Sequence, residues 1–520
     1  MNVNKKHTSR WATIAVLTLC IITRIYLISE KESLYGDETT SVILSQNATG
    51  WGNNTYKENH IYDACELKNN FFVDDKKGLS GWSDDIAALW NDNRDPSHAS
   101  LYYMLLRTSL TDQDQHSFKP IIWRGCILNL SLFIISFVCM AALLKKLLPG
   151  RHFLRTAILA MAYMNPMSIS SCLLLREYQL AECAILAFSL FAIAIADKIK
   201  AGKQFLNAKN IIAGGAISAV LLSSGYFNAI FALTAGIYLI WYAFRHKSQK
   251  EAITYFLLTA ITTIVLCTAV YKGFFNFTTD VRTSEVLDKA KGNNFIANLY
   301  YSAGAGVKML FFNILGPLLS LWFAACLITA MVKRHWCEQM PSLWIFAVSA
   351  IWFVFVLILS TWKMTRYVAP CIPMIAALAA YYSISLSRIT TPKRIIKYVP
   401  LILLLGWTFS GKSIEYLEKD RYTNFPDTDR AILYTAVPAD RDMLTLLTPC
   451  LTDSQQCVIV SDTSSIQKFA SPSGKTVYVF ADKNLDILQE TKGYDGHTEF
   501  NDWLWIYKIK RTEAIPTQLQ

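Results

Sequence analysis

The chain has 520 residues, of which 53% are hydrophobic and only 17% are charged, and its mean hydropathy is +0.27. A soluble protein carries roughly a quarter charged residues, so this composition excludes an ordinary soluble chain and indicates a membrane protein. The net charge of +11 is concentrated in short connections between apolar runs, and it gives no reason to expect a nucleic-acid partner.

Apolar runs close to the length that crosses a bilayer, about 20 residues, recur along the chain. They predict a polytopic α-helical membrane protein with about eleven transmembrane helices. The runs cover residues 11–29, 121–144, 153–173, 178–196, 209–223, 228–244, 252–272, 304–332, 342–360, 366–387 and 395–411.

Lysine and arginine gather at the N-terminus and in alternate connections between the runs, with few acids among them. The positive-inside rule therefore predicts a cytoplasmic N-terminus and an external, periplasmic C-terminus in an inner (plasma) membrane. The first run resembles a signal peptide, but no small-x-small cleavage site follows it, so we expect a retained anchor.

Two domains are predicted. Residues 1–411 form the transmembrane domain, including an external loop at 30–120 with amphipathic helical stretches. Residues 412–520 carry short β-like runs (457–460, 476–480 and 503–507) with helical stretches between them, which predict a small external α/β domain. Cys450 and Cys457 lie in this tail, where a disulfide is plausible in an oxidising compartment.

Asp37 and Glu38 are adjacent carboxylates just beyond the first apolar run, on its predicted external side. Charges this close to a bilayer are costly, but they suit the deprotonation of a hydroxyl or the binding of a cation. The alternative is a helix N-terminus, where acids complement the helix dipole. The two roles are compatible, because a cap also fixes the direction of a carboxylate.

Three basic residues, Arg176, Lys363 and Arg366, occur where the predicted topology places short external connections. One such residue could snorkel to the interface or pair with a neighbouring acid, as Arg176 could with Glu177. Three at the same depth favour an anionic ligand. Lipid phosphate is the obvious candidate, because arginine presents a forked donor set that matches phosphate oxygens.

A third polar element, Arg94-Asp95-Pro-Ser-His98, precedes an amphipathic stretch that begins Leu101-Tyr-Tyr. His98 could serve as a metal ligand or an acid/base group, although a histidine that bonds a nearby carboxylate is more common. Asp95 could simply cap the following helix. These three residues are candidates for positioning an acceptor or a metal. A divalent ion is compatible with the acids of this chain, but no ligand spacing requires one.

The order of these motifs resembles the GT-C glycosyltransferases, in particular the family 39/83 branch that includes protein O-mannosyltransferases and the lipid A aminoarabinose transferase. The resemblance covers about residues 10–200 and 340–390. It includes Thr365-Arg-Tyr-Val-Ala-Pro-Cys-Ile-Pro, which is similar to the Arg-Tyr-x-x-Pro-x-x-Pro span of that family. The sequence departs from it at the usual His-Pro-Pro, which here is Ser97-His98-Ala99.

The resemblance implies an inverting membrane glycosyltransferase, hexosyl or pentosyl, that needs no cofactor. Its donor would be a sugar on a polyprenyl phosphate such as undecaprenyl phosphate. Its acceptor would be a hydroxyl of an envelope glycan such as lipopolysaccharide, of a glycolipid or of a protein. Asp37 maps to the catalytic base, with Glu38 beside it. The residues implied in holding the donor phosphate are Arg176, Tyr178, Lys363, Arg366 and Tyr367.

Two alternatives belong to other classes. A polysaccharide polymerase or ligase would share the external face and the basic residues. A lipid-linked sugar flippase or secondary transporter would instead show charges buried at mid-span or broken helices in corresponding halves. Most predicted spans lack ionisable residues at their centres, which favours the transferase.

Overall fold

The computed structural model describes most of the chain. The described residues are 2–46, 56–69, 71, 78–95, 98–110, 118–279, 284, 295–332, 342–360, 362–390, 396, 398–418, 426, 428–436, 438–469, 476–482, 488, 493–499 and 504–510. The chain divides into two compact units. The first comprises Met1–Ile28, Pro96–Tyr102 and Cys126–Tyr416, and the second comprises Ser29–Asp95, Tyr103–Gly125 and Leu417–Gln520. Most of the predicted external loop thus groups with the C-terminal segment instead of with the helices.

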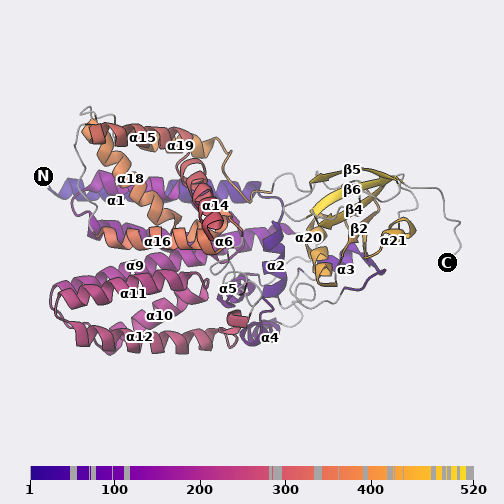
Figure 1. The fold of residues 1–520 in the computed structure, drawn as a ribbon, viewed down its shortest axis with the longest axis horizontal. Helices are drawn as coiled ribbons and strands as arrows, with labels where there is room; N and C mark the ends of the chain where they lie inside the picture. Colours follow the sequence, from indigo (N-terminus) through magenta and orange to yellow (C-terminus); the bar gives the residue numbers. More distant parts are fainter. Residues whose placement is uncertain are drawn as a thin grey trace. The chain divides into compact units, whose positions relative to one another are not determined.

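In its described residues, each predicted apolar run is mainly helical (Figure 1). The long helices are α1 (Asn2–Glu30), α6 (Phe118–Leu147), α7 (His152–Tyr163), α8 (Pro166–Leu173), α9 (Tyr178–Lys200), α10 (Ala208–Ser223), α11 (Asn228–Arg245), α12 (Gln249–Val270), α14 (Phe295–Lys308), α15 (Pro317–Val332), α16 (Leu343–Leu359), α18 (Ile372–Thr390) and α19 (Val399–Phe409). Two of the predicted runs are broken.

The run predicted at 153–173 is two helices, α7 and α8. Proline has no backbone N–H and favours the first position of a helix, so Pro166 ends one helix and begins the next. The side chain of Asn165 caps the new helix, because its Oδ1 accepts from the Ser168 backbone N–H at 2.9 Å.

The run predicted at 304–332 also breaks. The helix α14 starts at Phe295, before the predicted run begins at residue 304, and continues as a π-helical turn, η3 (Met309–Ile314). It then bends by 108° into α15. Gly316 at the bend has a φ of +78°, and a Cβ there would lie 2.5 Å from the Trp407 ring, so only glycine fits.

Among the described residues, five helices are long and apolar enough to cross a membrane, and the bent pair α14–α15 would make a sixth. The helices α10, α16 and α19 are apolar but shorter. The chain is therefore a multi-pass membrane protein, although these helix lengths do not establish the predicted count of eleven spans.

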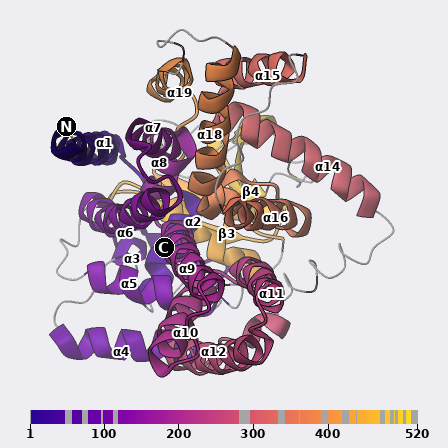
Figure 2. The same cartoon turned by 90° about the vertical axis from the view of Figure 1, so that its left-hand side faces the viewer.

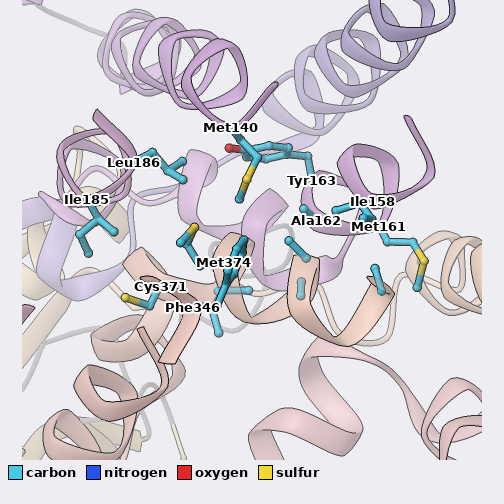
Figure 3. Close-up of a cluster of buried hydrophobic side chains, with 14 of the residues drawn as sticks. Met140, Ile158, Met161, Ala162, Tyr163, Ile185, Leu186, Phe346, Cys371 and Met374 are labelled. Carbon is cyan, nitrogen blue, oxygen red and sulfur yellow. The ribbon is translucent and has the colours of Figure 1, made fainter. Parts of the chain in front are cut away.

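A large apolar core holds the helical unit together. Seen end-on in Figure 2, α9, α10, α11 and α12 lie side by side. Figure 3 shows Met140 of α6, Tyr163 of α7, Leu186 of α9 and Met374 of α18 gathered in one buried cluster. These four side chains are at most 1% exposed.

The second unit is built around a six-stranded sheet with the order β1-β3-β2-β4-β6-β5. The strands are β1 (Ile61–Asp63), β2 (Arg430–Tyr434), β3 (Gln456–Val460), β4 (Thr476–Asp482), β5 (Tyr494–Glu499) and β6 (Leu504–Lys510). The three predicted strand runs form β3, β4 and β6. The strands β3, β2 and β4 are parallel, and β1 from the external loop adds antiparallel to β3. Alternating side chains fill an apolar cluster on each face.

Candidate functional site

The turn between α8 and α9 positions Arg176. Asn129 of α6 donates its amide to the Leu174 carbonyl at 2.7 Å, and Tyr102 donates its hydroxyl to Asn129 at 3.1 Å. The Arg176 backbone N–H in turn donates to the Leu174 carbonyl at 2.8 Å. The guanidinium is therefore attached to a backbone turn that two neighbouring side chains fix, and Arg176 is only 5% exposed.

Arg176, Glu177 and His98 form a triangle of ionisable side chains. The Arg176 Nη2 lies 3.0 Å from the His98 Nε2, and the Arg176 Nε lies 3.4 Å from the Glu177 Oε2. The Glu177 Oε1 lies 3.3 Å from the same His98 nitrogen. One ring nitrogen cannot accept from the arginine and donate to the carboxylate at once, so the triangle has two alternative hydrogen-bonding states. The predicted His98 is thus near a carboxylate, while Pro96 and Ser97 lie outside the described residues.

Arg366 lies in the short helix α17 (Thr365–Val368) and is 3% exposed. Its guanidinium carbon is 5.4 Å from the centre of the Tyr367 ring. The Tyr367 ring packs edge-on against Tyr178, with 6.3 Å between the ring centroids. Tyr178 itself follows Arg176 by two residues in the chain. The structure therefore brings together four of the five residues predicted to hold the donor.

Lys363 has a different environment. Its ammonium donates to the Ser360 carbonyl at 2.8 Å and to the Ile358 carbonyl at 3.2 Å, at the end of α16. The last carbonyls of a helix have no N–H partner within the helix, so an ammonium at this end can donate to them. Its positive charge also complements the negative end of the helix dipole. These contacts give Lys363 a capping role.

Glu415 is a carboxylate that the sequence analysis missed. Its Oε2 accepts from the Thr365 hydroxyl at 2.7 Å, and its backbone N–H donates to the Ser170 hydroxyl at 2.9 Å. It thus ties the segment after α19 to α8 and to the residue that precedes Arg366. Nothing in the spacing of the sequence identifies this contact, because Glu415 and Thr365 are joined only by the fold.

The acid pair lies at the start of α2 (Gly36–Ser45), in the second unit. Glu38 is fully buried; its Oε2 accepts from the Tyr35 backbone N–H at 2.5 Å and pairs with the Lys31 ammonium at 3.0 Å. This is the carboxylate half of a capping box. Asp37 is only partly buried. Glu38 therefore stabilises the first turn of α2, whereas the Asp37 side chain is accessible to solvent.

Arg94 and Asp95 form a tight turn in the second unit. The Asp95 Oδ2 accepts from the Tyr103 hydroxyl at 2.8 Å, and the Arg94 backbone N–H donates to the Asp92 Oδ1 at 2.8 Å. Arg94 has a φ of +58°, which is uncommon for a residue with a side chain. Burial lowers the pKa of its guanidinium, while Asp92 and Asp442 oppose that shift. Asp95 therefore anchors α5 (Leu101–Ser109) through Tyr103.

The membrane unit also buries two ionisable side chains that the sequence analysis passed over. The Arg24 guanidinium of α1 contacts the carbonyls of Tyr163 and Ser168 at 3.0 and 3.1 Å, at the break between α7 and α8. Glu182 of α9 accepts from the Gln179 amide at 3.0 Å and lies within electrostatic range of Arg24. Both are 0% exposed. The sequence contains a signal for both residues, because an ionisable side chain inside an apolar run is unusual and each of them lies inside a predicted run.

The sequence left a divalent ion open without requiring one, and it suggested a disulfide between Cys450 and Cys457. In the described part of the chain, no group of three or more His, Cys, Asp or Glu side chains could hold a metal ion. Cys450 and Cys457 are both described, and both are thiols packed among apolar residues of one cluster, so the predicted disulfide is not formed. Burial raises the pKa of the Cys457 thiol to about 12.

No family model and no curated protein sequence matches the chain. Solved structures do match. ArnT from Cupriavidus metallidurans bound to undecaprenyl phosphate has 10% identity and a TM-score of 0.46, covering 95% of this chain and 97% of its own. Its apo state gives a TM-score of 0.47. The oligosaccharyltransferase AglB from Archaeoglobus fulgidus, with an inhibitory peptide and a dolichol-phosphate, has 10% identity and a TM-score of 0.43, covering 98% of this chain and 75% of its own.

These solved structures share 10% identity with the chain, and their TM-scores lie between 0.43 and 0.47. Similarity at this level assigns no residue roles in this chain.

Proposed function

We propose that the chain is a membrane glycosyltransferase that moves a sugar from a polyprenyl phosphate to a hydroxyl of an envelope glycan, a glycolipid or a protein. The observation that carries the proposal is the position of Arg176 and Arg366. Both are nearly fully buried, they come from segments about 190 residues apart in the chain, and the rings of Tyr178 and Tyr367, which follow them in the chain, pack edge-on against each other. Two guanidinium groups at the ends of apolar helices suit one phosphate.

The reaction divides into three tasks. The acceptor hydroxyl gives its proton to a base while its oxygen attacks C1 of the sugar. The bond between C1 and the phosphate oxygen breaks, and its electron pair remains on the phosphate. A single displacement of this kind inverts the configuration at C1.

We assign the tasks to residues of this chain. Asp37 is the base, because it is the accessible member of the acid pair. Arg176 and Arg366 neutralise the charge that the departing phosphate acquires. Tyr178 and Tyr367 line the same cluster and orient the two guanidinium groups. Glu38 positions Asp37 by fixing the first turn of α2. No step in this scheme passes through a metal ion.

The base assignment is tested with the substitution Asp37→Asn. We expect transfer of a radiolabelled sugar from its polyprenyl phosphate to fall by roughly 10²- to 10⁴-fold, the usual contribution of a general base. The melting temperature in detergent should stay the same. The substitution Asp84→Asn is the matched control, because Asp84 is an exposed acid of the same unit. Turnover by Asp37→Asn equal to that of the control would remove Asp37 as the base.

A further inference from the structure

Glu177 is a carboxylate for which the proposed reaction has no use. It directly precedes α9, where an acid normally accepts a backbone N–H of the first turn, but its side chain makes no such capping bond. It turns instead towards Arg176 and His98. The side chain is directed at the arginine that the proposed function assigns to the phosphate.

The contact between Glu177 and Arg176 is close but loose. The Oε2 of Glu177 lies 3.4 Å from the Arg176 Nε and has no hydrogen-bond partner among the described residues, and Glu177 is only 7% exposed. A buried carboxylate oxygen without a hydrogen bond is costly. The pair is thus close enough for strong electrostatic attraction, yet it lacks the forked geometry that makes an arginine–carboxylate pair tight.

A phosphate and Glu177 compete for the same cation. Arginine presents its donors in one plane, and a carboxylate already near the Nε reduces what remains for a second anion. The two anions also repel each other in an environment from which water is largely excluded. A lipid phosphate bound to Arg176 must therefore bind against the charge of Glu177.

This competition matters for release of the product. The proposed reaction leaves a polyprenyl phosphate behind, and that lipid has to leave before the next donor binds. A phosphate product carries more charge than the phosphodiester of the donor, because its second ionisation has a pKa of about 6. Two buried arginines would hold this product more tightly than the donor.

We propose that Glu177 is a positioning residue that lowers the affinity of Arg176 for lipid phosphate and so allows the product to dissociate. This inference rests on the proposed function, because it takes Arg176 as a phosphate ligand. It predicts that removal of the Glu177 charge improves binding of the product. A residue that merely held Arg176 in place would have the opposite effect when replaced.

The experiment measures the Kd of undecaprenyl phosphate for the full chain in detergent. We expect Glu177→Gln to bind it about tenfold more tightly than wild type. Glu177→Asp withdraws the carboxylate by one methylene and should give an intermediate Kd, which keeps the test informative if the glutamine variant does not fold. Asp197→Asn is the matched control, because it removes an acid from the other end of α9.

The outcomes separate the two proposals. A Glu177→Gln variant that binds undecaprenyl phosphate equally well or more weakly than wild type overturns the role of Glu177. If wild type fails to bind the lipid, or if Arg176→Gln binds it as wild type does, the assignment of Arg176 and the proposed function fail instead. Product inhibition in steady-state assays should follow the same order as the Kd values, with Glu177→Gln inhibited most strongly.

Discussion

Arg24 and Arg176 are two buried arginines of the same helical unit with opposite kinds of partner. Most of the Arg24 contacts are to backbone carbonyls, those of Tyr163 and Ser168 at the break between α7 and α8, and the Ser168 hydroxyl also accepts from its guanidinium. Arg176 contacts the side chains of His98 and Glu177, and under the proposed function these turn away when a lipid phosphate binds. The comparison teaches that the identity of the partner, more than burial, separates an arginine that holds the fold from one that can bind a ligand.

Arg24→Met tests the structural half of this comparison and should have the largest effect. The variant leaves the Tyr163 and Ser168 carbonyls without their donor inside an apolar environment, which costs roughly 2–5 kcal/mol. We expect a large fall in melting temperature and in the yield of monodisperse protein in detergent. A variant that melts within a few degrees of wild type would contradict the role given to Arg24.

Arg176→Gln tests the functional half. The folded yield should fall less than for Arg24→Met, because the glutamine amide can still donate a hydrogen bond to the buried Glu177 carboxylate. The Kd for undecaprenyl phosphate should rise roughly tenfold to a hundredfold, the worth of a charged hydrogen bond. Arg151→Gln serves as the control at an exposed arginine of the same unit. If Arg176→Gln unfolds the protein as Arg24→Met does, the distinction between the two arginines is lost.

Lys363→Met sharpens the comparison with a smaller effect. Lys363 was predicted to hold phosphate, but its ammonium contacts two carbonyls at the end of α16. We therefore expect the Kd of undecaprenyl phosphate to change by about twofold or less, together with a small decrease in melting temperature. A loss of affinity as large as that of Arg176→Gln would return Lys363 to the phosphate site.

Cysteine labelling tests the second unit with the smallest expected effect. With a pKa of about 12, the Cys457 thiol stays neutral and unreactive at pH 8, whereas the exposed Cys65 should be modified rapidly. After unfolding without reductant, both Cys450 and Cys457 should react, as peptide mass spectrometry can show. If they remain unlabelled in the unfolded chain, they form the disulfide that the sequence alone suggested.

The sequence predicted the helices of the fold well, because each needs a long apolar run. Proline favours the first turn of a helix, so Pro166 and Pro317 are possible helix starts in the sequence. The hydropathy of the chain does not drop around either proline, so the sequence predicts one continuous run across each of them. Of the six described strands, β1, β2 and β5 were not predicted. The strand β1 has only three residues, and it exists through its pairing with β3, almost 400 residues further along the chain.

The candidate site was predictable where a residue was unusual for its place. Arg176 and Arg366 stood out because basic residues were not expected there, and Asp37 and Glu38 because two acids were adjacent. The sequence could not show that Glu38 is the buried acid and Asp37 the accessible one, because Glu38 is buried in an ion pair with Lys31. Glu415 and the loose contact of Glu177 likewise depend on side chains brought together by folding.

The most direct test of the account follows a radiolabelled sugar on undecaprenyl phosphate, added to proteoliposomes that contain the wild-type protein and membrane glycolipid or glycan acceptors. We expect label to become covalently attached to an acceptor, with inverted configuration at C1, and Asp37→Asn to reduce this transfer by roughly 10²- to 10⁴-fold. Label that crosses the bilayer still attached to undecaprenyl phosphate, with none transferred to any acceptor, would contradict a transferase and support a flippase.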